Sequence, residues 1–408
     1  MTKAGFGFIA TGVFIYFVAS QTQIGWLYLF DAIIWSLLTL SAILPWYSLK
    51  SLQVERQVLL STTILQGSQL GGPSEDEKVE VKLKVTNSGR LARYFIRVSE
   101  DCPFDQPEKR QRAFFIASIN PRSMTAFSYT ATCYRRGYYT SSNTTLESKG
   151  ILGLIVHRRT FQLPLNLTVY PTYYQMEGLP TAEAVWVDWG HAVKTSSAAA
   201  QFYGSREYQF GDPLKHIHWR NTARLGRFML KEFEQASQGS VTVAFESRRD
   251  FGTGRETTLE YSIKIAASLA KLCADSGHSI DIITGETPLH NAGWQEAMNY
   301  LARLKVGGKS AFVKLTTAPE LGQVAVAIVP AIETELVPTL LQLADRVGGL
   351  VVVLLEGFTP DEIPSELLSR LERRNLKIIT CCRGNLKTAV KELENSLFVA
   401  GRIPELVG

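Results

Sequence analysis

The chain has 408 residues, 45% of them hydrophobic and 20% charged, and a formal net charge of +5. This composition excludes a largely disordered chain, and the length is enough for two or three domains with cores of their own. The charge excess is modest, so it fits a surface that faces anionic lipid as well as one that faces nucleic acid.

The N-terminal region is much more apolar than the rest of the chain. Residues 4–20 carry no charged side chain, and residues 24–44 carry only Asp31. Each segment approaches the roughly 20 residues that a helix needs to span hydrocarbon, and only the turn "QTQ" separates them. The pattern therefore predicts a transmembrane helical hairpin. A cleavable signal peptide is the alternative for the first segment, but a strongly basic start is lacking and a second apolar span follows at once.

Charges at the two ends of the hairpin predict its orientation. Lys3 precedes the first apolar segment, Lys50 and Arg56 follow the second, and no Lys or Arg lies between. By the positive-inside rule, both ends of the hairpin and everything after it lie in the cytoplasm. We therefore expect an integral protein of the inner or plasma membrane whose soluble domains are cytoplasmic.

The cysteines fit a reducing compartment. They are odd in number and show no spacing typical of metal ligands. Their positions are Cys102, Cys133, Cys273, Cys381 and Cys382. We interpret them as reduced thiols.

The region that follows the hairpin has the pattern of an all-β domain. The stretch "KVEVKLKVTN" alternates polar and apolar side chains, as a strand with one solvated face does. Further strands are expected from "RYFIRVSE", "AFFIASI", "TAFSYTATCY", "GYYTSSNTTLES" and "FQLPLNLTVYP". Short strands at regular spacing, with Pro and Gly between them, predict an antiparallel β-sandwich.

From residue 241 the pattern changes to alternating strands and helices. The strands are short runs rich in Val and Ile: "VTVAFE", "SIDIIT", "VAVAIVP", "LVVVLLE" and "LKIIT". The segments between them have helical character, such as "TTLEYSIKIAASLAKLCADSG". Apolar strands that alternate with helices predict a mostly parallel sheet with both faces covered.

Two stretches resemble motifs of common enzyme classes but lack features that those motifs require. The stretch "GGKS" at 307–310 mimics the end of a phosphate-binding loop, but Arg303 stands where its first glycine belongs and a helical run precedes it. His216 and His218 are two residues apart and would point to different faces of a helix. We therefore expect neither ATP hydrolysis nor a zinc site in this chain.

The segment 203–234 carries an unusual number of basic and aromatic residues. Asp212 suits a helix N-cap, Pro213 the first helical position and Gly226 the stop. On such a helix Leu214, Ile217 and Ala223 would face inward, and "RFMLKEFE" would follow as a strand. Three interpretations stay open: a structural joint between domains, a recognition surface for a protein, and a nucleic-acid surface. The mixture of acidic residues and the few aromatics count against the last.

The same segment carries a longer pattern, R-x-Y-x-x-G-D-x(4)-I-x-W-x(3)-A-R. Its positions are Arg206, Tyr208, Gly211, Asp212, Ile217, Trp219, Ala223 and Arg224. In this order the chain resembles the domain-of-unknown-function 58 family. The stretches "RRGYYT", "ILGLIVHRR" and "LTVYP" are similar to the β region of that family, where an N-terminal membrane hairpin is also usual.

The resemblance implies a fold and a role. The C-terminal half of the chain would be an α/β Rossmann-like domain similar to von Willebrand factor type A domains. The partner of the chain would be a MoxR-type AAA+ ATPase that remodels or assembles other proteins. A type A domain commonly holds a divalent cation through D-x-S-x-S after its first strand. Here Glu246, Ser247 and Arg248 occupy that place. We expect no metal, because a guanidinium repels the ion and Glu246 would pair with Arg248, leaving Asp250 as a weak substitute.

Together these observations predict four regions: a hairpin at 1–50, a β-sandwich at 51–175, a connector with the family motif at 176–240, and a type A-like domain at 241–408. The expected function is a membrane-anchored adaptor that binds protein, with no cofactor, no nucleic acid and no catalytic residues. The alternative is an envelope-associated hydrolase whose site lies between the two soluble domains.

Overall fold

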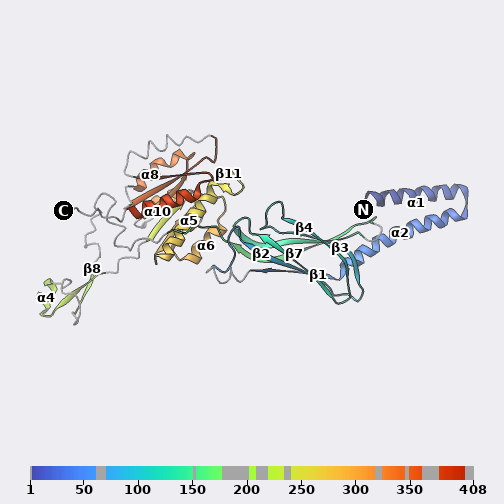
Figure 1. Ribbon diagram of the computed structural model, residues 1–408, viewed down its shortest axis with the longest axis horizontal. Helices are drawn as coiled ribbons and strands as arrows, with labels where there is room; N and C mark the ends of the chain where they lie inside the picture. Colours follow the sequence, from blue (N-terminus) through green and yellow to red (C-terminus); the bar gives the residue numbers. More distant parts are fainter. Residues whose placement is uncertain are drawn as a thin grey trace. The chain divides into compact units, whose positions relative to one another are not determined.

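The computed structural model divides into two compact units, Met1–Pro171 and Thr172–Gly408 (Figure 1). The residues that the structure describes are 2–60, 70–149, 153–176, 202–207, 219–233, 240–317, 324–344, 349–360 and 376–399.

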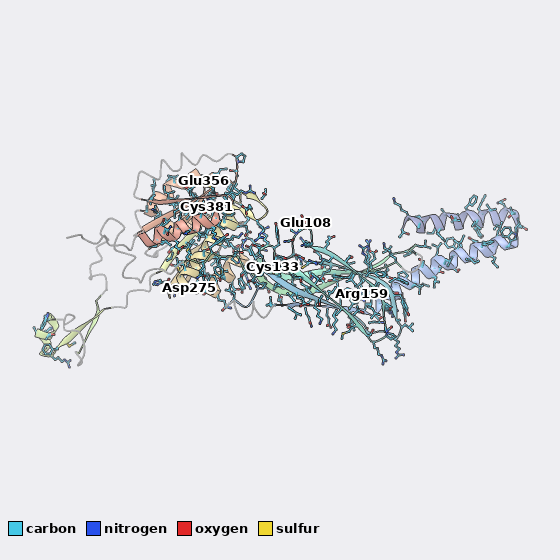
Figure 2. All side chains as sticks on the ribbon, in the orientation of Figure 1. Glu108, Cys133, Arg159, Asp275, Glu356 and Cys381 are labelled. Atoms are coloured by element: carbon cyan, nitrogen blue, oxygen red, sulfur yellow. The ribbon has the colours of Figure 1, made fainter. Side chains whose placement is uncertain are left out.

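The two apolar N-terminal segments form helices, as the sequence predicts. α1 spans Lys3–Thr22 and α2 spans Gly25–Lys50, and Gln23 ends α1 with a φ of 54°. Each helix is long and apolar enough to cross a membrane, and only 17% of its most apolar window is buried. Side chains project from both helices along their length (Figure 2). Asp31 lies on the buried face of α2, at 7% exposure.

The first unit continues with two antiparallel sheets. One has the order β1-β2-β5 and the other β4-β3-β6-β7. Their strands are β1 (Leu52–Leu59), β2 (Lys78–Asn87), β3 (Arg93–Asp101), β4 (Gln111–Ile119), β5 (Met124–Thr132), β6 (Gly137–Ser148) and β7 (His157–Val169). Strand β1 was not predicted; the other six match the predicted runs.

The two sheets pack face to face across a common core. Leu83 and Val85 of β2 lie in one hydrophobic cluster with Ile96 and Val98 of β3. These residues are two apart in sequence, so the alternation of "KVEVKLKVTN" and "RYFIRVSE" sends one set of side chains inward from each sheet. Leu49, at the end of α2, belongs to the same cluster and joins the helix to the sandwich.

The second unit is built on a sheet with the order β14-β13-β10-β15-β16-β17. All neighbouring strands are parallel except β13 and β14. The strands are β10 (Ser240–Phe245), β13 (Ser279–Ile283), β14 (Leu289–Ala292), β15 (Val324–Pro330), β16 (Gly349–Glu356) and β17 (Lys377–Cys382). The described α-helices around it are α5 (Thr258–Asp275), α6 (Trp294–Arg303), α7 (Ala311–Thr317), α8 (Val337–Ala344) and α10 (Leu386–Val399).

Helices cover both faces of this sheet. α7 and α8 share one hydrophobic cluster with Ala325 and Ala327 of β15 and with Val352 of β16. Helix α5 contacts α6 and α10 and lies on the opposite face. Every residue of β15 is buried, which is why its sequence is a continuous apolar run rather than an alternating one.

Part of the predicted connector is described. β8 (Phe202–Glu207) pairs with β9 (Met229–Phe233), and α4 (Trp219–Leu225) lies between them in sequence. Gly226 follows α4 with a φ of 71° and donates its N–H to the carbonyl of Thr222 at 2.9 Å. The predicted helix stop at Gly226 and the strand after it are confirmed.

Candidate functional site

The carboxyl edge of the parallel sheet holds the candidate site. From β10 the chain crosses by α5 to β13 on one side, and it later reaches β15 on the other side of β10. The carboxyl ends of β10 and β15 therefore flank a topological switch point, where open α/β sheets usually place their ligands. Glu246 follows β10 directly, and Glu333 follows β15.

Glu246 is fully engaged by its neighbours. It is 3% exposed, and its Oε1 accepts hydrogen bonds from the hydroxyl of Ser310 and from the backbone N–H of Ala311, the latter at 3.1 Å. Ala311 begins α7, so the carboxylate lies at a helix N-terminus, where negative charge is favoured. Its Oε2 accepts a hydrogen bond from Nε of Arg248 at 3.0 Å. Glu246 therefore joins β10, α7 and Arg248.

Ser247 fastens the neighbouring loops to the end of β10. Its hydroxyl donates to the carbonyl of Gly307 at 2.9 Å and accepts from the N–H of Gly285 at 3.1 Å. The N–H of Gly307 donates back to the carbonyl of Ser247 at 2.7 Å. Gly308 has a φ of 90°, and a Cβ there would lie 2.4 Å from the carbonyl oxygen of Gly285. The glycines of "GGKS" thus serve close backbone packing rather than phosphate binding.

Arg248 presents one edge of its guanidinium outward. Its side chain is 35% exposed, and Nε is bonded to the buried Glu246. Among the described residues its two Nη atoms have no hydrogen-bond partner. The pKa of Arg248 is raised, first by the hydrogen bond to Glu246. The result is a fixed positive charge with open donors.

These groups do not fit a divalent cation. Magnesium requires near-octahedral oxygen ligands, yet both oxygens of Glu246 are bonded and a guanidinium lies beside them. Asp250 is also in use, because its Oδ1 accepts from the N–H of Leu259 at 3.0 Å and supports the start of α5. Over the ranges that the structure describes, no cluster of three or more His, Cys, Asp or Glu side chains could hold a metal ion.

Glu333 adds a buried carboxyl group to the site. It is 3% exposed, and within the described part of the chain neither of its oxygens has a hydrogen-bond partner. Its pKa is raised, first by desolvation and then by the charge of Glu246, while Arg248 and Arg249 oppose the shift. Sequence reasoning missed Glu333. The available signal was its position as the first carboxylate after "VAVAIVP".

The motif residues of the connector are only partly placed. Arg206 lies in β8 opposite Leu230 of β9, and Trp219, Ala223 and Arg224 lie in α4. Tyr208, Gly211, Asp212 and Ile217 lie outside the described residues, as do His216 and His218.

Helix α4 presents its motif residues outward. Trp219 is 65% exposed, and Ala223 and Arg224 are exposed as well. The expectation that Ala223 faces inward is wrong. Thr222 is the residue that faces β9, since its hydroxyl accepts the N–H of Met229 at 3.0 Å, and the next residue of a helix points about 100° away.

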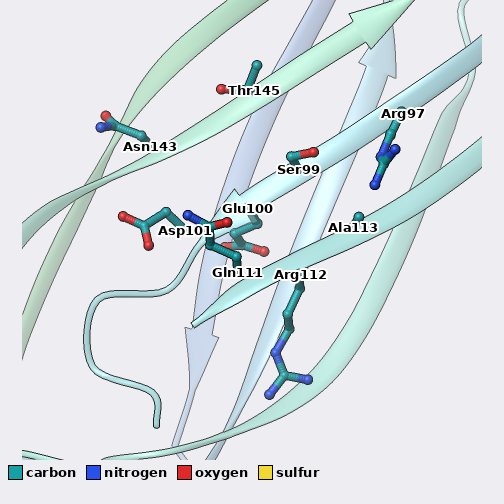
Figure 3. A pocket seen from close by; sticks show the side chains of 9 residues that line it. All are labelled: Arg97, Ser99, Glu100, Asp101, Gln111, Arg112, Ala113, Asn143 and Thr145. Carbon is teal, nitrogen blue, oxygen red and sulfur yellow. The ribbon is translucent and has the colours of Figure 1, made fainter. Parts of the chain in front are cut away.

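The sandwich carries a separate pocket of about 430 Å³ (Figure 3). All but one of its lining residues are polar or charged; the residues are Arg97, Ser99, Glu100, Asp101, Gln111, Arg112, Ala113, Asn143 and Thr145. Glu100 is paired with Arg56 at 2.6 Å, Asp101 with Arg110 at 2.7 Å and Arg112 with Asp105 at 2.6 Å. Because these charges serve ion pairs of the sandwich, the switch point is the stronger candidate site.

Part of the chain matches a known protein family. The family described as "Protein of unknown function DUF58" matches residues 204–302. This segment matches DUF58. The match confirms the family resemblance and runs from β8 to α6, so the DUF58 segment contains the connector motif as well as Glu246 and Arg248. The uncharacterized protein YeaD of Bacillus subtilis strain 168 is 26% identical over 388 residues, which cover 91% of this chain and 92% of YeaD.

Solved structures give weaker likenesses beyond the DUF58 match. The alkylpurine DNA glycosylase AlkC of Pseudomonas fluorescens is 8% identical with a TM-score of 0.14, covering 33% of this chain and 38% of that one. A GH20 exo-β-N-acetylglucosaminidase from Vibrio harveyi is 7% identical with a TM-score of 0.20, covering 79% and 60%. Scores this low carry no argument about fold or function.

Proposed function

We propose that this chain is a membrane-anchored, cytoplasm-facing protein that binds other proteins and does not turn over a substrate. The observation that carries the proposal is the pair of helices α1 and α2, whose large apolar side chains are exposed along both helices. Burial of this surface in hydrocarbon is favourable by about 25 cal/mol per Å². Lys3 and Lys50, at the ends of the two helices, support an orientation with both ends in the cytoplasm.

In this proposal the second unit is a von Willebrand factor type A-like domain. Support comes from its parallel sheet with an antiparallel edge strand, β14, and from the switch point beside the central strand β10. The partner that the family resemblance implies is a MoxR-type AAA+ ATPase. The chain would hold that ATPase, or its cargo, at the membrane.

The contact that we propose for the partner is Arg248. Its Nε is held by a buried carboxylate, so the guanidinium is already oriented before binding. The open Nη edge matches the geometry of a carboxylate, which such an edge can bind through two parallel hydrogen bonds. The site thus supplies a fixed protein charge where a type A domain would use a cation.

The test uses the full chain in lipid nanodiscs and a purified MoxR-type ATPase, with ATP or ADP present. We expect binding that depends on the nucleotide. Arg248→Gln should weaken it by at least about tenfold, because the loss of even one of the two charge-assisted hydrogen bonds has that effect. The matched control is Lys391→Gln, which removes an exposed positive charge from α10. Absence of binding in both nucleotide states, or equal loss in the control, would contradict the proposal.

A further inference from the structure

One end of the β-sandwich lies where α2 enters it. Leu52, the first residue of β1, pairs with Asn87 at the end of β2, and Met124 at the start of β5 pairs with Thr86. Arg93, the first residue of β3, pairs with the last residue of β4. The β2–β3 and β4–β5 turns therefore lie beside the end of α2. We call residues 87–95, 119–124, 147–149 and 153–159 the helix-proximal end.

Direct contacts fix the helix-proximal end to both helices. The guanidinium of Arg93 stacks on the ring of Tyr47 at 4.1 Å, and its Nε donates to the hydroxyl of Ser51 at 3.1 Å. Arg159 donates to the carbonyls of Leu49 and Lys50 at 3.2 Å each, at the junction visible in Figure 2. The N–H of Thr2, just before α1, donates to the carbonyl of Leu154 at 3.0 Å. This end is thus held at the level where α1 begins and α2 ends.

The helix-proximal end exposes large apolar side chains. Leu91 is 57% exposed, Tyr94 53%, Phe95 46% and Met124 61%. Strand alternation would send one of two adjacent residues inward, yet Tyr94 and Phe95 both face outward. Phe95 has a φ of 55°, which is uncommon for a bulky residue. The backbone departs from regular geometry at the point where it presents two neighbouring aromatic rings to the outside.

Positive charge surrounds these apolar side chains. The exposed basic residues of the helix-proximal end are Arg90, Arg122, Lys149, Arg158 and Arg159. No Asp or Glu occurs in residues 86–99 or 113–132. The one carboxylate of this end, Glu147, is paired with Arg158 at 2.9 Å and with Lys149 at 3.5 Å. Arg90 and Arg122 therefore face outward with no acidic residue in their own turns.

We propose that the helix-proximal end is a lipid-binding surface. Leu91, Tyr94 and Phe95 enter the boundary between headgroups and acyl chains, and Arg90 and Arg122 pair with anionic headgroups. Aromatic side chains prefer this boundary, and basic clusters beside a transmembrane helix are attracted to anionic lipid. This inference rests on the proposed membrane anchoring, since α1 and α2 set the level of the bilayer. The bilayer would then hold the sandwich upright as a rigid stalk.

A lipid-quenching measurement tests the surface on the full chain. In a Cys382→Ser background the remaining cysteines are buried, so a single introduced cysteine can carry an environment-sensitive fluorophore. The probe sites are Leu91→Cys at the helix-proximal end, Phe14→Cys on α1, and Lys78→Cys at the opposite end of β2. The nanodiscs contain zwitterionic lipid with about one-third anionic lipid, a composition in which surface charge attracts basic residues. One set carries a nitroxide near the headgroup, for the probe at Leu91→Cys, and a second set carries it on the acyl chain, for the probe at Phe14→Cys.

We expect nitroxide lipid to quench the probes at Leu91→Cys and Phe14→Cys but not the probe at Lys78→Cys. Failure at Phe14→Cys would overturn the membrane anchoring itself. Quenching at Phe14→Cys without quenching at Leu91→Cys would overturn the lipid-binding surface and leave the anchoring intact. If the probe at Leu91→Cys shifts to the blue without being quenched by nitroxide lipid, protein rather than lipid covers this end, and the proposal is also overturned.

The charges are tested in the same Leu91→Cys protein. Arg90→Gln with Arg122→Gln should reduce the lipid quenching at least twofold in anionic nanodiscs and leave it unchanged in zwitterionic ones. The matched control, Lys387→Gln with Lys391→Gln, removes the same charge from the exposed side of α10 and should leave quenching unchanged. Equal quenching in the arginine variant and the control would overturn the role of Arg90 and Arg122.

Discussion

At the scale of single residues, Glu333 carries a carboxyl group whose pKa lies above its ordinary value because of desolvation and, second, the nearby charge of Glu246. The folded state therefore binds this proton more tightly than the unfolded state. The resulting stability is fully present below the unfolded pKa of 4.5 and is lost as the pH rises through the folded pKa.

We predict that Glu333→Gln removes the part of the stability loss at rising pH that comes from this carboxyl group. As the pH rises above the unfolded pKa of 4.5, the melting temperature of the variant should fall less than that of the wild type, because glutamine has no proton to lose. The control is Glu335→Gln, whose side chain is 73% exposed. Identical pH dependence in wild type and Glu333→Gln would show that Glu333 is not protonated in the folded protein.

A second residue-scale prediction concerns the ion pair of Arg56 and Glu100 inside the sandwich. Their side chains are 1% and 0% exposed, and the shortest N–O distance is 2.6 Å. Glu100→Ala should destabilise the first unit by about 3–5 kcal/mol, because it leaves a buried guanidinium without its partner. Replacing both residues by apolar ones of similar size should recover most of that loss.

The neighbouring residue provides the matched control for this pair. Asp101 is 32% exposed and pairs with Arg110, which is 51% exposed. Asp101→Ala should cost about 0–1 kcal/mol, as exposed ion pairs do. The comparison comes from denaturant or thermal unfolding of the wild type, Glu100→Ala and Asp101→Ala in the same detergent. Equal losses in Glu100→Ala and Asp101→Ala would contradict the importance of burial.

At the scale of elements, the switch-point site depends on close packing between the ends of β10 and β13 and the loop before α7. A Cβ at Gly285 would lie 2.5 Å from the hydroxyl of Ser247 and 2.7 Å from the carbonyl oxygens of Gly307 and Lys309. We predict that Gly285→Ala separates these loops and destabilises the second unit by about 1–3 kcal/mol, the usual cost of overpacking.

Hydrogen exchange locates the effect of that change. Amides 305–311 should exchange faster in Gly285→Ala than in the wild type, since the bonds of Ser247 to this loop are lost. Gly293→Ala is the control, because a Cβ there meets nothing within 4 Å. Unchanged exchange at 305–311 would mean that the loop does not rely on this contact.

Sequence patterns predicted elements better than they predicted contacts. The apolar runs of β10, β13, β15, β16 and β17 were identifiable because both faces of the sheet are covered. Helix α7 and strand β14 were missed, since a helix of seven residues and a strand of four carry too little periodicity. Strand β1 was missed as well, although Leu52 and Val54 are buried at alternate positions.

The site needed information that is not local in sequence. Glu246 and its neighbour Arg248 could be paired from their spacing. Ser310 bonds to Glu246 because α7 packs against β10, and the charge of Glu246 acts on Glu333 because β15 lies beside β10. The outward orientation of Phe95 could not be predicted from the sequence either, because the alternation of β3 predicts that one of Tyr94 and Phe95 faces inward. Strand order and backbone conformation therefore decide what residue types alone could not.

At the scale of the whole molecule, we propose that two helices anchor the chain and that the sandwich and the second unit lie in the cytoplasm. Burial raises the pKa of the thiols of Cys133, Cys273 and Cys381 to about 12, and that of Cys102 to about 11. Cys382 alone is exposed. The native protein should therefore take up one equivalent of a thiol reagent, and five after denaturation.

The most direct test of the anchoring and orientation uses Cys382 as the reporter, because it lies in the second unit and needs no introduced residue. A membrane-impermeant maleimide is applied to intact spheroplasts and to inverted membrane vesicles, and Cys382→Ser gives the background. The account predicts that the chain stays in the membrane fraction after alkaline carbonate extraction and that Cys382 reacts in inverted vesicles only. Labelling in intact spheroplasts, or release of the chain by carbonate, would contradict it.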